Sequence, residues 1–251
     1  MEEKLIMKKF LVLSLISLIA PLALADNSKN GVYISAKMGA SILQMKGQFF
    51  PYIVFPNNIN EKQKGDNHRT AVFGTGLSLG YDFYDNFNLP VRAELDFTSR
   101  ANADYNYSKS QENSIFFLRN TIKNQIEANT LMFNAYYDFK NPSDFTPYLS
   151  AGLGYAYLSQ KTSQIATLGI SGGKTSTETL QTRSHATNNF AWSAGAGIKY
   201  TVSQDFSFDL SYKYLDAGQA EVDYFNLDGV ETNVKTKVRT HDIMLSATYH
   251  F

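Results

Sequence analysis

Eight segments of this sequence alternate apolar and polar residues, and this pattern limits the folds open to the chain more than any other feature. A period of two places successive side chains on opposite faces of a β-strand. In the first segment Val32, Ile34 and Ala36 share one face, while Tyr33 and Ser35 share the other. The pattern therefore predicts an all-β chain. The eight segments are residues 32–42, 73–83, 91–97, 130–139, 149–157, 192–200, 206–214 and 242–251.

Short and long connections alternate between these segments. The short ones contain Asn, Asp or Ser, which favour turns, and they cover residues 84–88, 140–146 and 203–205. The long ones are polar and cover residues 44–70, 99–125, 159–189 and 216–237. Such long connections are uncommon in a compact soluble domain, but outer-membrane barrels combine short periplasmic turns with long extracellular loops. The connections therefore favour a transmembrane barrel over a soluble β-sandwich.

The polar face of the segments carries charges of both signs, so the uncharged, aromatic face must be the one that contacts lipid. We predict an eight-stranded antiparallel transmembrane up-and-down β-barrel with four long extracellular loops and short periplasmic turns. A barrel of this size is just wide enough for side chains to fill it. Because an unpaired buried charge is costly, we expect the interior charges to pair across the lumen, and no continuous water-filled channel follows. The predicted interior charge network is Lys37, Arg92, Glu94, Asp96, Asp138, Lys199, Asp209, Lys213 and Asp242.

The first 25 residues have the organisation of a secretory signal peptide. Lys8 and Lys9 precede an apolar run, Phe10–Ala20, that is too short to span a bilayer, and Ala23-Leu24-Ala25 is an A-x-A cleavage site. We therefore expect residues 1–25 to be a signal peptide cleaved near Ala25, and residues 26–251 to form the outer-membrane β-barrel domain. This places the mature protein in the outer membrane of a Gram-negative bacterium.

Composition excludes several classes of function. Lys+Arg and Asp+Glu number 23 each, so no overall basic charge indicates a nucleic-acid partner. The chain has no cysteine, which rules out disulfides, thiolate metal sites and cysteine nucleophiles. Mean hydropathy is −0.27, and after the N-terminal region no apolar run approaches the roughly 20 residues that a membrane helix needs.

Four stretches of the sequence resemble the small opacity-like outer-membrane barrels, which are akin to the transmembrane domain of outer membrane protein A. They are Leu79–Phe83, Val91–Phe97, Pro147–Gly154 and the terminal Tyr249-His250-Phe251. The C-terminal Phe looks like the insertion signal of such proteins, which implies the barrel-assembly machinery as a partner of the last strand. The resemblance covers nearly the whole mature chain, but it is specific to architecture only. Proteins of this kind include adhesins, immune-evasion factors and small porin-like proteins.

The four histidines do not form a catalytic pattern. His241 and Asp242 are neighbours, so in a strand they face opposite ways and cannot form a dyad. His250 should lie at the periplasmic mouth, and His68 and His185 fall in different predicted loops. No two histidines have the spacing of metal ligands. We therefore predict no enzymatic activity, no metal and no cofactor.

Two of the predicted loops contain unusual apolar residues. The first holds an apolar stretch that could bind a partner or could belong to the outer aromatic girdle, with Pro51 ending the strand. In the second, apolar residues at steps of three and four suit a short amphipathic helix, although the fourth strand could equally continue there. The candidate partner-binding residues of the first loop are Phe49, Phe50, Tyr52, Ile53, Val54 and Phe55.

These observations lead to one functional hypothesis and two alternatives. The hypothesis is a surface protein, an opacity-like adhesin or surface antigen, that binds a host-surface ligand through its loops. Its other expected partners are outer-membrane lipid and lipopolysaccharide. The alternatives are a small porin-like channel, suggested by small interior residues such as Gly152 and Gly195, and a structural envelope protein without a ligand.

Overall fold

The computed structural model describes residues 30–46, 49–54, 59–64, 68–112, 116–170, 173, 175–225 and 231–251. The predicted signal peptide and Phe55 lie outside these residues. No helix in the described part of the chain is long and apolar enough to cross a membrane.

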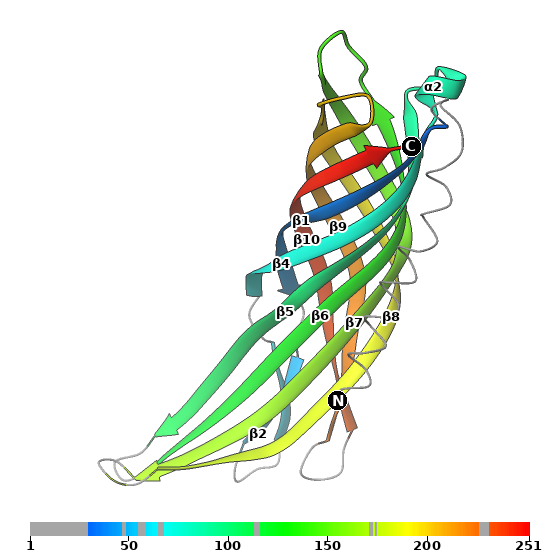
Figure 1. Cartoon of the computed structure of the whole chain (residues 1–251). Helices are drawn as coiled ribbons and strands as arrows, with labels where there is room; N and C mark the ends of the chain where they lie inside the picture. Colours follow the sequence, from blue (N-terminus) through cyan, green and yellow to red (C-terminus); the bar gives the residue numbers. More distant parts are fainter. Residues whose placement is uncertain are drawn as a thin grey trace, which may run out of the picture.

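The strands close into one antiparallel barrel, as the alternation predicted (Figure 1). Closure depends on β1 (Val32–Lys46), which pairs with the last strand, β10 (Glu231–His250), on one side and with β4 (His68–Asp82) on the other. Every other strand pairs with its neighbours in the sequence, so the topology is up-and-down. The remaining strands of the barrel are β5 (Val91–Glu112), β6 (Phe116–Asp138), β7 (Phe145–Ile170), β8 (Thr175–Thr201) and β9 (Phe206–Phe225).

The predicted short connections lie together at one end of the barrel. The first contains the single helical turn α2 (Tyr84–Phe87), which ends at Asn88 in the left-handed conformation (φ 52°). Asn tolerates this conformation better than most residues and often ends a helix in this way. The other two connections are residues 139–144 and 202–205. This end is the periplasmic one, because outer-membrane barrels place their short turns there.

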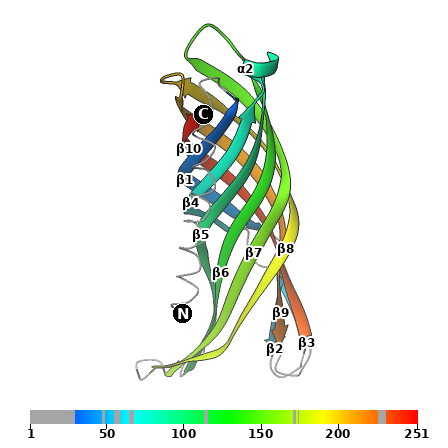
Figure 2. The same ribbon diagram turned by 45° about the vertical axis from the view of Figure 1, so that its right-hand side comes forward.

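Much of the chain predicted to form long loops is instead strand. Residues 99–125 and 159–189, which were expected to be long polar loops, belong largely to β5–β8, which contain 22, 23, 26 and 27 residues. A membrane crossing needs only roughly 9–11 residues. The helix considered for the second loop is likewise not formed, since the strand β6 continues through it. Figures 1 and 2 show β5–β8 running together far beyond the ends of β1 and β4.

The first predicted loop also contains strand structure. A hairpin of β2 (Phe49–Val54) and β3 (Ile59–Lys64) forms a separate two-stranded sheet, with Tyr52 opposite Glu61. The five candidate residues Phe49, Phe50, Tyr52, Ile53 and Val54 therefore belong to a strand rather than to a loop.

The two faces of the barrel wall are inverted relative to a soluble protein. Phe133 on the outer face is 60% exposed, whereas Arg92 on the inner face is 6% exposed. The inner face is tightly filled, and Gly80 shows why small residues are needed there. A Cβ at this position would lie 2.1 Å from the ring of Tyr33. Apolar side chains thus form the lipid-facing surface, and polar side chains fill the lumen.

Candidate functional site

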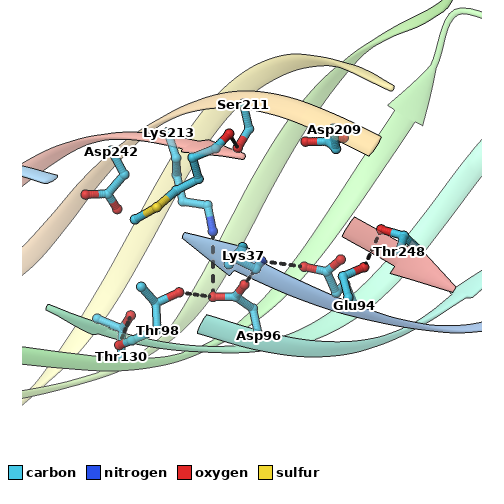
Figure 3. A network of polar contacts seen from close by, with 12 residues as sticks. Lys37, Glu94, Asp96, Thr98, Thr130, Asp209, Ser211, Lys213, Asp242 and Thr248 are labelled. Carbon is cyan, nitrogen blue, oxygen red and sulfur yellow. Dashed lines mark hydrogen bonds and ion pairs between the residues drawn. The ribbon is translucent and has the colours of Figure 1, made fainter. Parts of the chain in front are cut away.

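Asp96 lies at the centre of a charge network in the periplasmic half of the lumen (Figure 3). Lys37 of β1 contacts it directly, and the Nζ atom of Lys213 on β9 lies 3.7 Å from its Oδ1 atom. The hydroxyl of Thr98 donates a hydrogen bond of 2.8 Å to the same carboxylate. Strand β5 is therefore tied across the lumen to two strands that are not its neighbours in the sheet.

Glu94 continues the network toward the periplasmic end. Lys37 also pairs with this carboxylate at 3.2 Å. The hydroxyls of Tyr33 and Tyr136 donate hydrogen bonds to it at 3.3 and 2.9 Å. The ammonium of Lys37 compensates the charge of Glu94, and donors from two strands, β1 and β6, bind its carboxylate, so it can remain inside the barrel.

Arg92 and Asp138 form the next layer. The guanidinium donates to both carboxylate oxygens, at 2.9–3.1 Å, and lies over the rings of Tyr136 and Tyr148 at 4.6 and 5.0 Å. The ammonium of Lys199 lies 3.5 Å from Asp138. Such bidentate pairing fixes geometry as well as charge.

Two further members of the predicted network sit elsewhere in the lumen. Asp209 accepts a hydrogen bond of 2.7 Å from the hydroxyl of Tyr148. Asp242 pairs with Arg100 at 2.5 Å, and Arg100 also donates to Thr130 at 3.2 Å. Every residue of the predicted interior charge network thus faces the lumen and has a polar partner there. A cavity of about 30 Å³ remains among these residues, which is room for about one or two waters.

The sequence pattern did not indicate Arg100 as a member of this network, because the third alternating segment ends at Phe97. A signal was present, because Arg92, Glu94, Asp96, Thr98 and Arg100 fall on the same parity of one strand. Arg100 is 2% exposed and is the largest fully buried side chain in the described part of the chain. The polar side chains of this strand therefore continue to face the lumen beyond Phe97, at least as far as Arg100.

An apolar layer in the extracellular half of the lumen was also missed. The residues that form it lie on inward-facing positions of the strands, most of them toward the extracellular end from Asp96, whose register partner is Met132. Leu43 and Met45, for example, share the inward parity of Lys37. Apolar residues at these positions did not fit the predicted pattern, in which the inward-facing residues are polar. The layer comprises Leu43, Met45, Ala103, Tyr105, Ile126, Ala128, Met132, Ala156, Leu158, Ala191, Leu215, Ala217, Ala220 and Val238.

The histidines occupy unrelated positions. His241 faces outward and interacts with the hydroxyl of Tyr212 at 2.7 Å and the amide of Gln44 at 2.8 Å, whereas Asp242 faces inward. His250 lines a cavity at the periplasmic mouth. The expectation that His68 and His185 lie in loops is wrong, since they belong to β4 and β8. Within the described residues no group of three His, Asp or Glu side chains could hold a metal ion.

The outer parts of β5–β8 form a polar sheet outside the barrel. Register pairs between β8 and β9 end at Trp192, whereas those between β8 and β7 continue to Thr175. Each described side chain from Thr175 to Ala186 is exposed. Hydroxyl pairs link neighbouring strands, for example Ser163 with Thr182 at 3.0 Å. This edge of the sheet therefore presents a solvated surface rich in Ser and Thr.

Comparisons with known proteins agree with this architecture. The model of the outer membrane protein beta-barrel domain family matches residues 10–251. Outer membrane protein PagN of Salmonella typhimurium is 36% identical, over 98% of this chain and 100% of its own. A Rickettsia conorii protein described as a candidate adhesin is 25% identical, over 88% and 83%. Opacity protein opA57 of Neisseria gonorrhoeae is 20% identical, over 90% and 100%.

Fold and comparisons together define the class: this is a Gram-negative outer-membrane β-barrel protein, similar to the opacity proteins. The chain belongs to the outer membrane protein beta-barrel domain family. The resemblance drawn from the strand motifs and from the C-terminal Phe is confirmed.

Proposed function

We propose that this protein is an adhesin whose ligand-binding surface is the extracellular part of β5–β8 together with the β2–β3 hairpin. The observation that carries the proposal is the length of these strands. Outward-facing aromatic residues on β7 end at Tyr157, yet the strand continues to Ile170. At about 3.3 Å per residue this stretch spans roughly 40 Å. The sheet can therefore hold a binding surface well away from the lipid surface.

The chemistry of the sheet supports binding to a polar partner. Strand β8 presents exposed hydroxyl and charged side chains along its outer edge, including Glu178 and Arg183. Strand edges and ordered polar surfaces are common recognition elements in proteins that bind other chains. Among the relatives, the Rickettsia conorii protein is described as a candidate adhesin, and this gives the same reading independent support.

The β2–β3 hairpin contributes the apolar part of the proposed surface. The sequence of β2, Phe-Phe-Pro-Tyr-Ile-Val, contains only apolar or aromatic residues, and it begins close to the outer end of β1. An apolar run in a segment outside the barrel sheet is a common feature of segments that bind partners. Phe55, the last of the candidate residues, directly follows β2.

The proposal assigns the protein neither catalysis nor conduction. The scattered positions of the histidines support the absence of catalysis. The charge network and the apolar layer together fill the lumen, which supports the absence of conduction. Planar-bilayer recording of the purified barrel checks the second part directly. Silent bilayers are expected, and steady channels that change when Arg92 is replaced by Gln would support a porin-like role instead.

Hairpin shortening tests the adhesin proposal without disturbing the barrel. Gln164 and Gln181 are direct partners, so residues 165–180 can be replaced by an Asn-Gly turn. Val222 and Val234 are direct partners on β9–β10, so replacing residues 223–233 gives a matched control. A third variant replaces Phe49–Val54 with a Ser/Gly segment of equal length.

Each variant is displayed on a non-adherent Gram-negative strain, and bound bacteria are counted on epithelial cells at equal surface amounts. Shortening β7–β8 or replacing β2 should lower adhesion several-fold, while shortening β9–β10 should leave it near the level of the full-length protein. Unchanged adhesion in both the β7–β8 and the β2 variants would overturn the proposal.

A further inference from the structure

A group of cations lies on the outer surface of the barrel at the level where the apolar band ends. Arg69 of β4 and Arg239 of β10 are the register partners of Gln44 on β1, one on each side. One step further outward, Lys46 is directly opposite Lys237. Strands in a sheet are about 4.8 Å apart, so these four side chains share a small area across three adjacent strands. We call Lys46, Arg69, Lys237 and Arg239 the basic rim.

The position of the basic rim relative to lipid follows from the residues below it. On the same outer face, the row beneath Gln44 consists of Ile42 with its partners Ala71 and His241, and the next rows include Phe73 and Ile243. Phe73 and Ile243 are 57% and 50% exposed, as lipid-facing side chains are. The basic rim therefore begins directly where the lipid-facing surface stops, which is the height of the lipid headgroups.

Aromatic residues beside the rim mark the same boundary. Tyr214 packs against both Trp192 and His241, with ring centroids 5.5 and 5.4 Å apart. Girdles of such residues occupy the membrane interfaces of outer-membrane barrels. Two separate features, the end of the apolar rows and the aromatic cluster, thus place the basic rim at the extracellular interface.

The rim carries excess positive charge. Asp216 lies 3.0 Å from Arg239 and 3.8 Å from Lys237. Within the described residues, Lys46 and Arg69 form no ion pair, and like charges placed directly opposite each other, as Lys46 and Lys237 are, destabilise a sheet. Around the rest of the barrel, the first outward-facing positions above the apolar residues are neutral, namely Ser99, Asn129, Ser159 and Asn188, and the next positions on β6 and β7 carry opposite charges, Glu127 and Lys161. The positive charge is therefore concentrated on β4, β1 and β10.

We propose that the basic rim binds the phosphate groups of lipid A, the phosphorylated glycolipid of the outer leaflet. A phosphate at headgroup height compensates the facing Lys46 and Lys237, and the two Arg side chains can donate bidentate hydrogen bonds to it. The acyl chains of the same lipid lie along the apolar rows below. A soluble sulfated polysaccharide would meet the charges but not these rows, so the geometry favours the lipid. This inference requires only the membrane location, and it does not depend on the adhesin proposal.

The test uses the full-length barrel in phosphatidylcholine nanodiscs. Fluorescent lipid A with two phosphates is titrated into the discs in parallel with the dephosphorylated form. One variant carries Lys46→Gln, Arg69→Gln, Lys237→Gln and Arg239→Gln. The matched control loses two Lys and two Arg from the extracellular sheet through Arg119→Gln, Lys123→Gln, Lys161→Gln and Arg183→Gln.

The rim variant should bind the bisphosphorylated lipid at least about tenfold more weakly, because each interfacial cation contributes to holding an anionic headgroup. The control should stay within about twofold of the wild type, and the dephosphorylated lipid should bind all three proteins equally weakly. Retention of the folded band in unheated gel samples shows that each variant is a closed barrel. Equal losses in the rim variant and the control, or no preference for phosphate in the wild type, would overturn the proposal.

A second variant tests the lipid A site by a substitution that should strengthen binding instead of weakening it. Asp216→Asn removes the acid that contacts two rim cations, so it should tighten binding of the bisphosphorylated lipid by about two- to threefold. Heparin binding is measured alongside. If the rim substitutions weaken heparin binding while leaving lipid A binding unchanged, the rim is a site for a soluble polyanion and the lipid assignment is wrong.

Discussion

In the periplasmic half of the lumen, charged side chains from several strands compensate one another, whereas in the extracellular half the inward positions carry mainly Leu, Ile, Val, Met and Ala beside uncharged polar residues such as Gln160 and Thr236. Both halves are buried to a similar degree, as Asp96 and Leu158, each at 0% exposure, illustrate. A narrow barrel can therefore be filled by either chemistry. The stability of the charged half depends on the pairing of every buried charge, while the stability of the apolar half depends on how completely the side chains fill the space. Their responses to substitution should differ accordingly.

The largest effect is expected from breaking one buried ion pair. Arg100→Ala leaves the carboxylate of Asp242 without its guanidinium, and removing one partner of a buried pair costs about 3–5 kcal/mol. Urea unfolding in lipid vesicles, followed by the fluorescence of Trp192, measures this loss. Ser99→Ala, on the outer face of the same strand, is the control and should change little. A loss below about 1 kcal/mol would contradict the view that the charged half depends on pairing.

A somewhat smaller effect is expected in the apolar half. Leu158→Ala creates a cavity in a packed layer and should lower the free energy of unfolding by about 2–4 kcal/mol. Leu153→Ala on the lipid-facing side of the same strand is the matched control, because lipid can fill the space that the smaller side chain leaves. The same unfolding assay applies. Equal losses at the two positions would mean that the extracellular half of the lumen is not closely packed.

Replacing both members of the buried ion pair with apolar residues should restore the stability that Arg100→Ala loses. The double variant Arg100→Met with Asp242→Leu removes both charges together, and such replacements of buried pairs are often neutral or stabilising. We expect it to unfold within about 1 kcal/mol of the wild type, well above Arg100→Ala alone. If the double variant is as unstable as the single one, the hydrogen bond of Arg100 to Thr130 (3.2 Å) matters more than the charges do.

The sequence predicted the barrel wall because the membrane imposes strict alternation on it. Phe133 faces lipid and Asn134 faces the lumen, and this contrast repeats on all eight strands. The same contrast located the interior charges. It failed in two places, where the alternation of apolar outward and polar inward residues is lost.

The first place is the extracellular sheet, where water contacts both faces. Residues 175–186 show no alternation, so Ser and Thr looked like loop residues although they form strand β8. The second place is the apolar layer, where Leu158 faces the lumen between the outward-facing Tyr157 and Ser159. Whether a lumen position is charged or apolar depends on side chains reaching across from strands far away in the sequence. That information is absent from the pattern of any one strand.

The smallest effects are expected from removing one hydroxyl group, and they should differ between the lumen and the extracellular sheet. The hydroxyl pair Ser35–Thr248 (2.7 Å) is buried in the lumen, and the pair Ser163–Thr182 (3.0 Å) is exposed on the extracellular sheet. Thr248→Val leaves the Ser35 hydroxyl without that partner in a buried site, which should cost about 1 kcal/mol. Thr182→Val leaves Ser163 free to bond to water and should cost a few tenths of a kcal/mol. Amide hydrogen exchange resolves both values locally, and equal losses would show that the extracellular sheet is as closed to solvent as the lumen.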